Sequence, residues 1–349
     1  MPVSAAGRRV IRVRHTCRAM TRRDVVVPGG MPSFDAVGEM AERAEALGYD
    51  RISVPEVTGR DAVTVLATLA ERTDGIGLSN DVLSPWGRSP AMLGQTGVTL
   101  QEASGGRYRM GLGTSSPALT EQWHLGHYDR PLRRLREAIV IVKQVASGGR
   151  LEYDGEVFDG GGLALRGVEP ATVPVDVAAL GPKTTELAGR FADGWLPQLL
   201  TTDALADRLV DLRRGADLGD REPADLRVAV TVRSCALDDA SRAREVARRQ
   251  IAFMVAAYGP YYRQSIARQG FDAETDAIHD AWTGGDRADA VAAVTAEMVD
   301  SLVAVGTPAT VRETVARYEA VDGVDAVRVG FFGQMTAEER RRTMTVLEP

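Results

Sequence analysis

The sequence predicts an α/β fold, a (β/α)8 TIM barrel, from three observations. Eight short runs rich in β-branched residues each precede a longer amphipathic stretch, an alternation typical of parallel sheets flanked by helices. Eight such units close a barrel, and 349 residues are enough to build one. The alternative is an open, doubly wound sheet, which is disfavoured because no GxGxxG motif stands at the first strand–helix turn.

The expected strands are short apolar runs rich in valine, leucine and isoleucine. The first, VVVP, has the composition of a buried strand, and RISVPE and VPVDVAAL resemble it. The eight strands are expected at residues 25–28, 51–56, 75–83, 107–116, 173–180, 194–199, 226–237 and 324–332.

The expected helices follow these strands and have recognisable ends. Ser33 is an N-cap candidate and Gly48 a C-cap candidate for the first helix. Residues 131–147 form the strongest helical pattern, with Pro131 at the start and apolar residues at helical spacing. The remaining helices are expected at 61–73, 89–104, 182–192, 204–216 and 336–347.

Two segments interrupt the alternation and are predicted to be insertions. Residues 148–170 suggest a hairpin, since Asp154-Gly155 is a turn signal. Residues 239–303 are mostly helical and longer than one crossover needs. We therefore expect one domain over residues 21–349, preceded by a disordered or mis-started arginine-rich leader over residues 1–20.

Composition narrows the classes of function. The net charge of -6 disfavours nucleic acid as a partner, because phosphate binding needs a basic face. No run of about 18 apolar residues predicts a membrane span. The two cysteines, Cys17 and Cys235, are far apart and indicate no disulfide framework. We expect a cytoplasmic protein that forms a dimer or tetramer of identical chains and acts on a small molecule.

Barrel enzymes carry their active site at the carboxyl ends of the strands. In this chain those ends are rich in glycine and hydroxyl residues, and their charges are Glu56, Asp81 and Lys183. A metal hydrolase is disfavoured, because clustered histidines and carboxylates are missing there, and we expect no metal. His124 and His127 are expected on the rim of a loop rather than as a ligand pair. Nucleophile-elbow and Walker A motifs are absent from the sequence.

Two motifs at the strand ends favour a bound cofactor that carries its own reactivity. GLGTSS (111–116) offers two glycines for close backbone approach and three hydroxyl groups. GPKTT (181–185) opens a helix, so its free amides, the positive end of the helix dipole and Lys183 would together hold a phosphate. Each motif alone could be an ordinary glycine-rich turn.

These residues resemble the bacterial luciferase-like flavin and deazaflavin oxidoreductases, and most closely the branch around coenzyme F420-dependent methylenetetrahydromethanopterin reductase. The resemblance runs from about Val25 to the C-terminus. The motifs that carry it are ISVPEVTGRDAVTVLATLAERT, IGLSNDVLSPWGRSPAMLGQT, GGRYRMGLGTSS, DRPLRRLREAIVIVKQV, ALGPKTTELAGRFADGWLPQ and VGTPATVRETVARYEA.

The resemblance implies a barrel with the cofactor across its carboxyl-terminal mouth. Asp81-Val82 then matches a non-prolyl cis peptide and bulge behind the reactive ring, and Glu56 matches an acidic residue near the ring's polar edge. The implied cofactor-binding residues are Asp81, Val82, Leu83, Gly113, Thr114, Ser115, Gly181, Pro182, Lys183 and Thr184. One departure is that the reductases carry a glutamate in the first strand, where this chain reads DVVVPG.

The leading hypothesis is hydride transfer between coenzyme F420 and a small organic substrate, first of all a methylene-tetrahydropterin or methylene-tetrahydrofolate C1 carrier. Glu56 is the candidate catalytic residue, as proton donor or ring-edge partner; the structural alternative is an ion pair with Arg60 or Arg88. The candidate substrate wall, for which rim packing is the alternative, consists of Trp86, Trp123, His124 and Tyr128, with Tyr153 as a further aromatic residue.

Two other hypotheses stay open. An FMN-dependent luciferase-like monooxygenase would keep the fold and change the cofactor; Pro55-Glu56 at the end of the second strand, where no histidine stands, favours the deazaflavin. A non-catalytic barrel would bind a partner through the insertion at 239–303, whose candidate contact residues are Phe253, Met254, Tyr258, Tyr261 and Tyr262.

Overall fold

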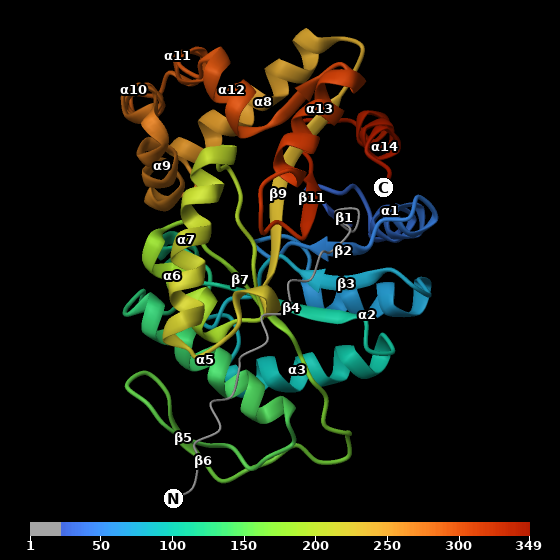
Figure 1. Ribbon diagram of the computed structural model, residues 1–349, viewed down its shortest axis with the longest axis vertical. Helices are drawn as coiled ribbons and strands as arrows, with labels where there is room; N and C mark the ends of the chain where they lie inside the picture. The colour runs from blue at the N-terminus through green and yellow to red at the C-terminus, as the bar shows by residue number, and fades with distance from the viewer. Residues whose placement is uncertain (1–21) are drawn as a thin grey trace, which may run out of the picture.

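The computed structural model describes residues 22–349, so the expected leader lies outside the described residues. Eight parallel strands form the predicted barrel in the ring order β1-β2-β3-β4-β7-β8-β9-β11, and pairings of β8 with β9 and of β11 with β1 close it (Figure 1). These strands are β1 (Arg22–Val26), β2 (Arg51–Val54), β3 (Gly77–Asn80), β4 (Tyr108–Gly113), β7 (Val175–Ala178), β8 (Gly194–Trp195), β9 (Arg227–Ala236) and β11 (Ala326–Gly330). Each predicted strand is confirmed, with ends shifted by a few residues.

Helices surround the ring, and polar side chains cap most of their first turns. Ser33 accepts from the amide of Ala36 at 3.0 Å, which confirms the predicted N-cap. Gly48, predicted as the C-cap, lies one residue beyond the cap with a φ of 83°. The helices outside the large insertion are α1 (Phe34–Ala46), α2 (Ala62–Arg72), α3 (Pro90–Ala103), α4 (Pro117–Gln122), α5 (Pro131–Ala146), α6 (Pro182–Phe191), α7 (Thr202–Leu218), η1 (Pro223–Asp225), α13 (Pro308–Glu319) and α14 (Ala337–Val346).

Both predicted insertions are present. β5 (Glu152–Asp154) and β6 (Asp159–Gly161) form an antiparallel hairpin at the lower left of Figure 1. The helical insertion lies at the upper left and contains α8 (Ala240–Ala256), α9 (Pro260–Ile266), η2 (Ala267–Phe271), α10 (Asp272–Thr283), α11 (Arg287–Ala292) and α12 (Ala296–Leu302).

One strand lies beyond the predicted set. β10 (Ala304–Gly306) pairs with the far end of β9, at Ser234–Ala236. β9 is ten residues long, so its carboxyl end extends past its pairings with β8 and β11 and is free to pair again. The insertion therefore returns to the barrel through a parallel pairing before α13 begins.

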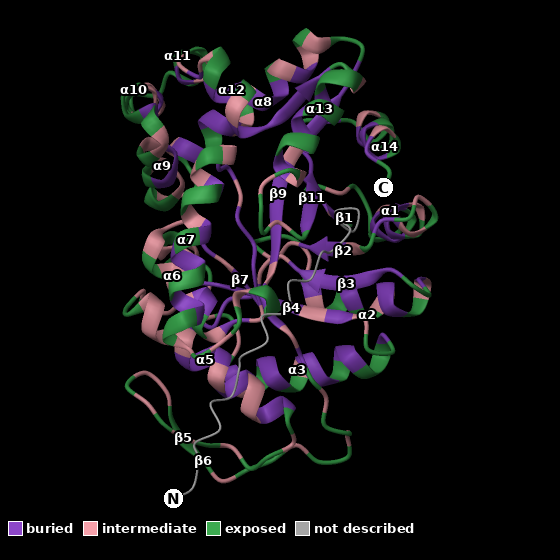
Figure 2. Cartoon of the chain, viewed as in Figure 1, coloured by how far each residue is buried: buried purple, intermediate pink, exposed green. Residues whose placement is uncertain are grey.

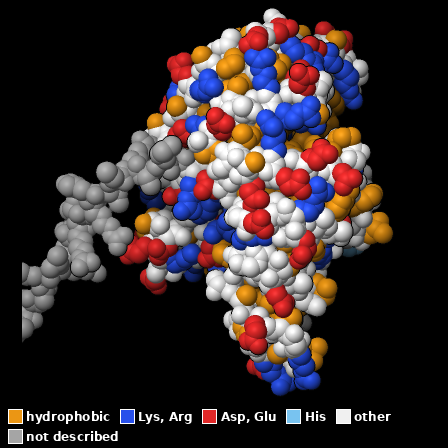
Figure 3. All heavy atoms as spheres, turned by 90° about the vertical axis from the view of Figure 1, so that its right-hand side faces the viewer, with side chains coloured by type: hydrophobic (Ala, Val, Ile, Leu, Met, Phe, Trp, Pro, Cys, Tyr) orange, Lys and Arg blue, Asp and Glu red, His pale blue; other side chains and the backbone are white. Residues whose placement is uncertain are grey.

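The main apolar core lies between the strands and the inner faces of the helices, where buried residues gather in Figure 2. On the outer surface acidic and basic side chains are interspersed (Figure 3). Over residues 22–349, no helix combines the length and the apolar character needed to cross a bilayer.

Candidate functional site

The loop after β3 shapes one side of the barrel mouth. Its Asp81–Val82 peptide bond is cis, as the resemblance implied, and Leu83 forms a parallel bridge with Leu112 of β4. A Cβ at Gly113 would lie 2.7 Å from Cγ2 of Val82, and one at Gly111 would lie 2.3 Å from the carbonyl oxygen of Asn80. The two glycines of GLGTSS therefore admit this loop against β4.

A buried arginine, which the sequence analysis missed, joins this loop to the far side of the barrel. Arg328 of β11 is 2% exposed. Its Nη1 donates to Oγ1 of Thr231 on β9 at 2.9 Å, and its Nη2 lies 2.9 Å from Oδ1 of Asp81. Asp81 is therefore held by an ion pair inside the barrel. In the sequence, Arg328 is distinguished only by its place between Val327 and Val329 in β11, since successive side chains of a strand point to opposite faces.

Arg233 lies two residues beyond Thr231 on β9. The register pairs it with Gly330, where a Cβ would come within 3.3 Å of Cγ of Arg233, so the glycine makes room for it. Its Nη1 donates to the carbonyl oxygen of Phe331 at 2.8 Å. Burial lowers the pKa of the Arg233 guanidinium, while the charge of Asp81 acts in the opposite direction.

Glu56, at the end of β2, is fixed by three donors. Both terminal nitrogens of Arg88 donate to the carboxylate of Glu56, and the bond from Nη2 is 3.1 Å long. The backbone amide of Ala62 donates to the same carboxylate at 2.9 Å. Arg88 also pairs with Asp61, the N-cap of α2. The expected structural alternative, an ion pair with Arg88, is therefore present, while Arg60 instead donates to the carbonyl oxygen of Met31.

His124 lies beside this acidic and basic cluster. Its Cε1 is 2.8 Å from where a Cβ on Gly87 would stand, so the loop carrying the imidazole packs against the loop after β3. Burial lowers the pKa of His124, the charge of Glu56 opposes this effect, and the charge of Arg88 adds to it. The structure thus brings His124 and Glu56, predicted separately, to the same place.

Two of the expected wall residues form an aromatic cluster with the helical insertion. The rings of Trp86 and Tyr128 stack at a centroid distance of 5.1 Å, and the hydroxyl of Tyr261 donates to that of Tyr128 at 3.0 Å. Trp123 differs, since it is 58% exposed, and Tyr153 lies on the hairpin. Trp86 and Tyr128 are therefore positioned together at the mouth, whereas Trp123 lies on the surface.

Ser115 is a polar residue without a partner. Its φ of 58° is in the left-handed region, and its Oγ is buried with no hydrogen bond within the described residues. Thr114 beside it lies against Tyr128, whose pKa is raised chiefly by burial. An unpaired buried hydroxyl is costly, so a ligand that bonds to it would be favoured.

The GPKTT segment opens α6 as predicted. Gly181 is the N-cap and makes no side-chain capping bond, so the first-turn amides of Lys183 and Thr184 have no intrahelical acceptor. Pro182 is at the first helical position, where a missing N–H costs nothing. Lys183 is 76% exposed and lies 3.6 Å from Glu186.

A second cation adjoins this helix end and was not predicted. Nη1 of Arg268, in the helical insertion, lies 4.0 Å from where a Cβ on Gly181 would stand. Since 87 residues separate Arg268 from Gly181 in the sequence, no local motif could reveal the pair. Free helix amides and nearby cations such as Lys183 and Arg268 are the kinds of group that bind anions in proteins.

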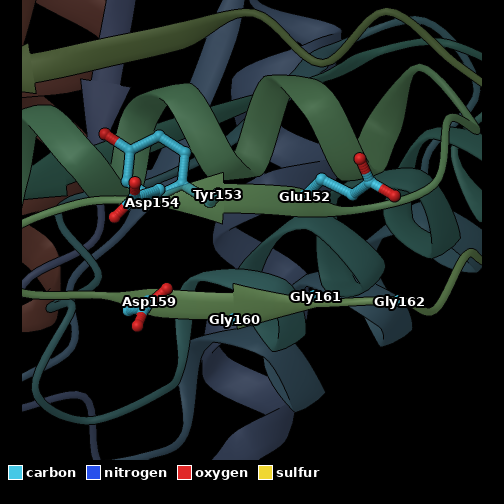
Figure 4. A pocket seen from close by; sticks show the side chains of 7 residues that line it. All are labelled: Glu152, Tyr153, Asp154, Asp159, Gly160, Gly161 and Gly162. Carbon is cyan, nitrogen blue, oxygen red and sulfur yellow. The ribbon is translucent and has the colours of Figure 1, made fainter.

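A pocket away from these residues lies along the hairpin. It is lined by Glu152, Tyr153, Asp154 and residues 159–162, whose strands lie side by side in Figure 4. The other predicted site residues are not among its lining. From residue 22 onward, the structure contains no group of three or more histidine, cysteine or carboxylate side chains that could hold a metal ion.

Comparison with known proteins gives a consistent picture. The model of the luciferase-like monooxygenase family matches residues 13–342. The 5,10-methylenetetrahydromethanopterin reductase of Archaeoglobus fulgidus is 32% identical over 279 residues, which cover 78% of this chain and 82% of the reductase. A putative coenzyme F420-dependent oxidoreductase of Mycobacterium tuberculosis is 29% identical over 301 residues, covering 81% and 87%.

A solved structure extends the similarity of fold. The coenzyme F420-dependent tetrahydromethanopterin reductase of Methanopyrus kandleri superimposes with a TM-score of 0.82 at 21% sequence identity. The alignment covers 95% of this chain and 98% of that protein.

Proposed function

Because the chain belongs to the luciferase-like monooxygenase family and is an oxidoreductase of that family, we propose that it transfers hydride between coenzyme F420 and a small organic substrate. One observation carries the proposal. The uncapped N-terminus of α6, flanked by Lys183 and Arg268, lies at the same end of the barrel as the Asp81–Val82 bulge. A cofactor with an anionic tail and a flat ring would use both features.

The residues present fit such a cofactor. The anionic tail would bind the amides of Lys183 and Thr184 and the two cations beside them. The buried Oγ of Ser115, which has no partner within residues 22–349, would bond to the polar middle of the cofactor. Val82 would back the ring, because Gly113 lets this loop pack against β4.

When bound, the deazaflavin supplies a hydride donor or acceptor carbon that reacts poorly with oxygen. The chain's own groups orient substrate on the exposed ring face and exclude water. Trp86, Tyr128 and Tyr261 supply the apolar cover over this end of the barrel. The carboxylate of Glu56 accepts three bonds, from Arg88 and Ala62, which leaves about one acceptor position for an N–H at the ring edge. This arrangement suits a ring-edge partner better than a proton donor.

The substrate we propose first is a methylene-tetrahydropterin or methylene-tetrahydrofolate C1 carrier. The proposal draws on the similarity to a methylenetetrahydromethanopterin reductase along most of both chains. The first strand supplies no acid near the substrate, because β1 ends in Val25 and Val26. Hydride adds to the iminium carbon without a proton at that carbon. Opening the methylene bridge to that iminium places one proton on the departing nitrogen, and solvent or the proton released when the reduced deazaflavin is oxidised would supply it in place of a first-strand acid.

The alternative is an FMN-dependent monooxygenase, which the family's description favours. FMN also carries one phosphate and would fit the same helix end.

Absorbance titration tests the proposal directly. We expect stoichiometric binding of coenzyme F420, with affinity well above that for FMN, followed by oxidation of reduced F420 when a methylene-tetrahydropterin is added without oxygen. FMN binding accompanied by oxygen consumption would replace the proposal with its alternative. Binding of neither cofactor would exclude both.

A further inference from the structure

We propose that Arg233, supported by Arg328, binds an anionic group of the substrate, so that this enzyme acts on a molecule bearing a carboxylate or a similar oxyanion. The inference deepens the proposed function, on which it rests for the reaction, by naming a class of substrate. It stands on the placement of charges inside the barrel mouth.

The first observation is an excess of positive charge. The inner faces of two paired strands carry Arg328 and Arg233, and the one carboxylate within 4.0 Å of either guanidinium among the described residues is Asp81. Asp81 pairs with Arg328. Arg233 is thus left with a backbone carbonyl as its acceptor and, among the described residues, with no carboxylate within 4.0 Å, although it is half-buried.

The second observation is unused hydrogen-bonding capacity. Nε of Arg233 is buried and has no hydrogen-bond partner among the residues that the structure describes. Nη2 of Arg328 lies close to Asp81 but makes no hydrogen bond that meets the geometric criteria. Within residues 22–349 it is the one buried terminal nitrogen of an arginine without a hydrogen bond. A buried donor left unpaired costs free energy, and an oxyanion would satisfy it with a charge-assisted bond.

The surroundings indicate what the rest of the ligand is like. Tyr258 and Tyr262 pack edge to face at 5.5 Å, and the charge of Arg233 acts on the pKa of both hydroxyls. Gln198 donates to the hydroxyl of Tyr262 and so fixes that ring. A flat apolar body beside the anionic group would lie against these rings.

The geometry argues against a purely structural role for Arg233. Structural arginines in this barrel either pair with a carboxylate, as Arg109 does with Asp176, or donate to several backbone carbonyls, as Arg51 does to those of Leu78 and Arg107. Arg233 donates to one carbonyl, that of Phe331. A Cβ at Gly330 would lie 3.3 Å from Cγ of Arg233, so the glycine eases the packing of a half-buried cation that pairs with no carboxylate among the described residues. Burial lowers the pKa of Arg233, and a bound anion would reverse that effect.

Calorimetry with benzoate and benzamide tests the inference, because the two probes share shape and differ in charge. Titrations at fixed ionic strength would use the protein with and without coenzyme F420, and F420 binding would be measured separately by absorbance. We expect wild type to bind benzoate at least about tenfold more tightly than benzamide. Arg233→Met should remove this difference, and Arg233→Lys should restore part of it.

Two variants keep the outcome clear. Lys183→Ala, at the N-terminus of α6, should retain the preference for benzoate, whereas Arg328→Lys should weaken it. Equal binding of benzoate and benzamide by wild type would overturn the inference. So would a benzoate preference that persists in Arg233→Met, or loss of F420 binding in that variant. Failure of F420 to bind wild type, with the benzoate preference intact, would reject the proposed function alone.

Discussion

The two lysines of this chain differ in their surroundings, although all other basic residues among the 42 are arginines. Lys143 donates to the carbonyl oxygen of Phe191 and pairs with Asp193 at 2.9 Å. Lys183 extends from the first turn of α6 and is 76% exposed. Because a compact ammonium can approach a phosphate beside backbone amides, the position suits lysine.

Lys183→Ala should weaken coenzyme F420 binding by roughly tenfold, the loss of about one charge-assisted bond. The thermal midpoint should stay within error, because the exposed side chain contacts only Glu186. Absorbance titration and a melting curve measure the two effects. Lys143→Ala is the matched control, with the reverse expectation of lower stability and unchanged affinity. Unchanged affinity in Lys183→Ala would refute the phosphate role.

His124 makes stability depend on pH. Burial lowers its pKa in the folded protein, so below the unfolded value of about 6.5 the unfolded chain binds more protons. Stability should therefore fall as the pH drops from about 7 through that value toward the lowered folded pKa. Urea midpoints measured between pH 7.5 and pH 5 should fall less in His124→Gln than in wild type. His127→Gln provides the comparison; an equal slope in all three proteins would contradict the assignment.

At the scale of elements, the eight barrel strands were predictable because each is a short apolar run followed by an amphipathic helix. β10 was not, since three residues carry no periodicity and the pairing depends on the extra length of β9. The candidate site likewise contains residues that the sequence predicts and residues that it does not. GLGTSS and GPKTT are contiguous, whereas Arg328, Arg233 and Arg268 reach the mouth from separate strands and from the insertion.

The contact between β4 and the loop after β3 can be tested by a pair of variants. In Gly113→Ala the new Cβ would lie 2.7 Å from Cγ2 of Val82, which should cost about 1–3 kcal/mol of unfolding free energy. Val82→Ala removes the clashing methyl group, so the double variant should recover part of this loss. Urea denaturation of the four proteins gives the coupling. Additive effects would mean that the strain at Gly113 has another source.

At the scale of the whole molecule, the two ends of the barrel interior differ. The amino-terminal end is filled by Asp24, Arg51, Arg109, Asp176 and Arg227, and ion pairs join Arg109 and Arg227 to the two aspartates. Arg51 instead donates to two backbone carbonyls, and burial lowers its pKa to about 10. Charges at this end hold the strands together, whereas at the mouth no carboxylate of the described residues lies within 4.0 Å of the Arg233 guanidinium. The ion pairs at the amino-terminal end are therefore structural, and the binding role proposed above belongs to the charges at the mouth.

Asp176 tests the structural end. Burial alone would raise its pKa, but the hydrogen bond and charge of Arg109, with the charge of Arg227, hold the pKa below its ordinary value. Its contribution to stability is therefore complete above the unfolded pKa of about 3.9 and is lost as the pH falls below that value. Asp176→Asn should cost about 3–5 kcal/mol near neutral pH, because Arg109 would stay buried without its counter-charge.

Equilibrium unfolding from pH 7 to pH 3 measures both effects, and the variant should lose less stability below pH 4 than wild type does. Asp238→Asn is the control, since Asp238 forms an ion pair with Arg342 on the surface and its loss should change little. If Asp176→Asn proves too unstable to purify, Arg109→Lys retains the charge and loses the two-point contact. Because the network lies at the end of the barrel opposite the mouth, the folded fraction of either variant should bind coenzyme F420 with unchanged affinity. Weakened cofactor binding would show that the two charge systems are coupled through the barrel.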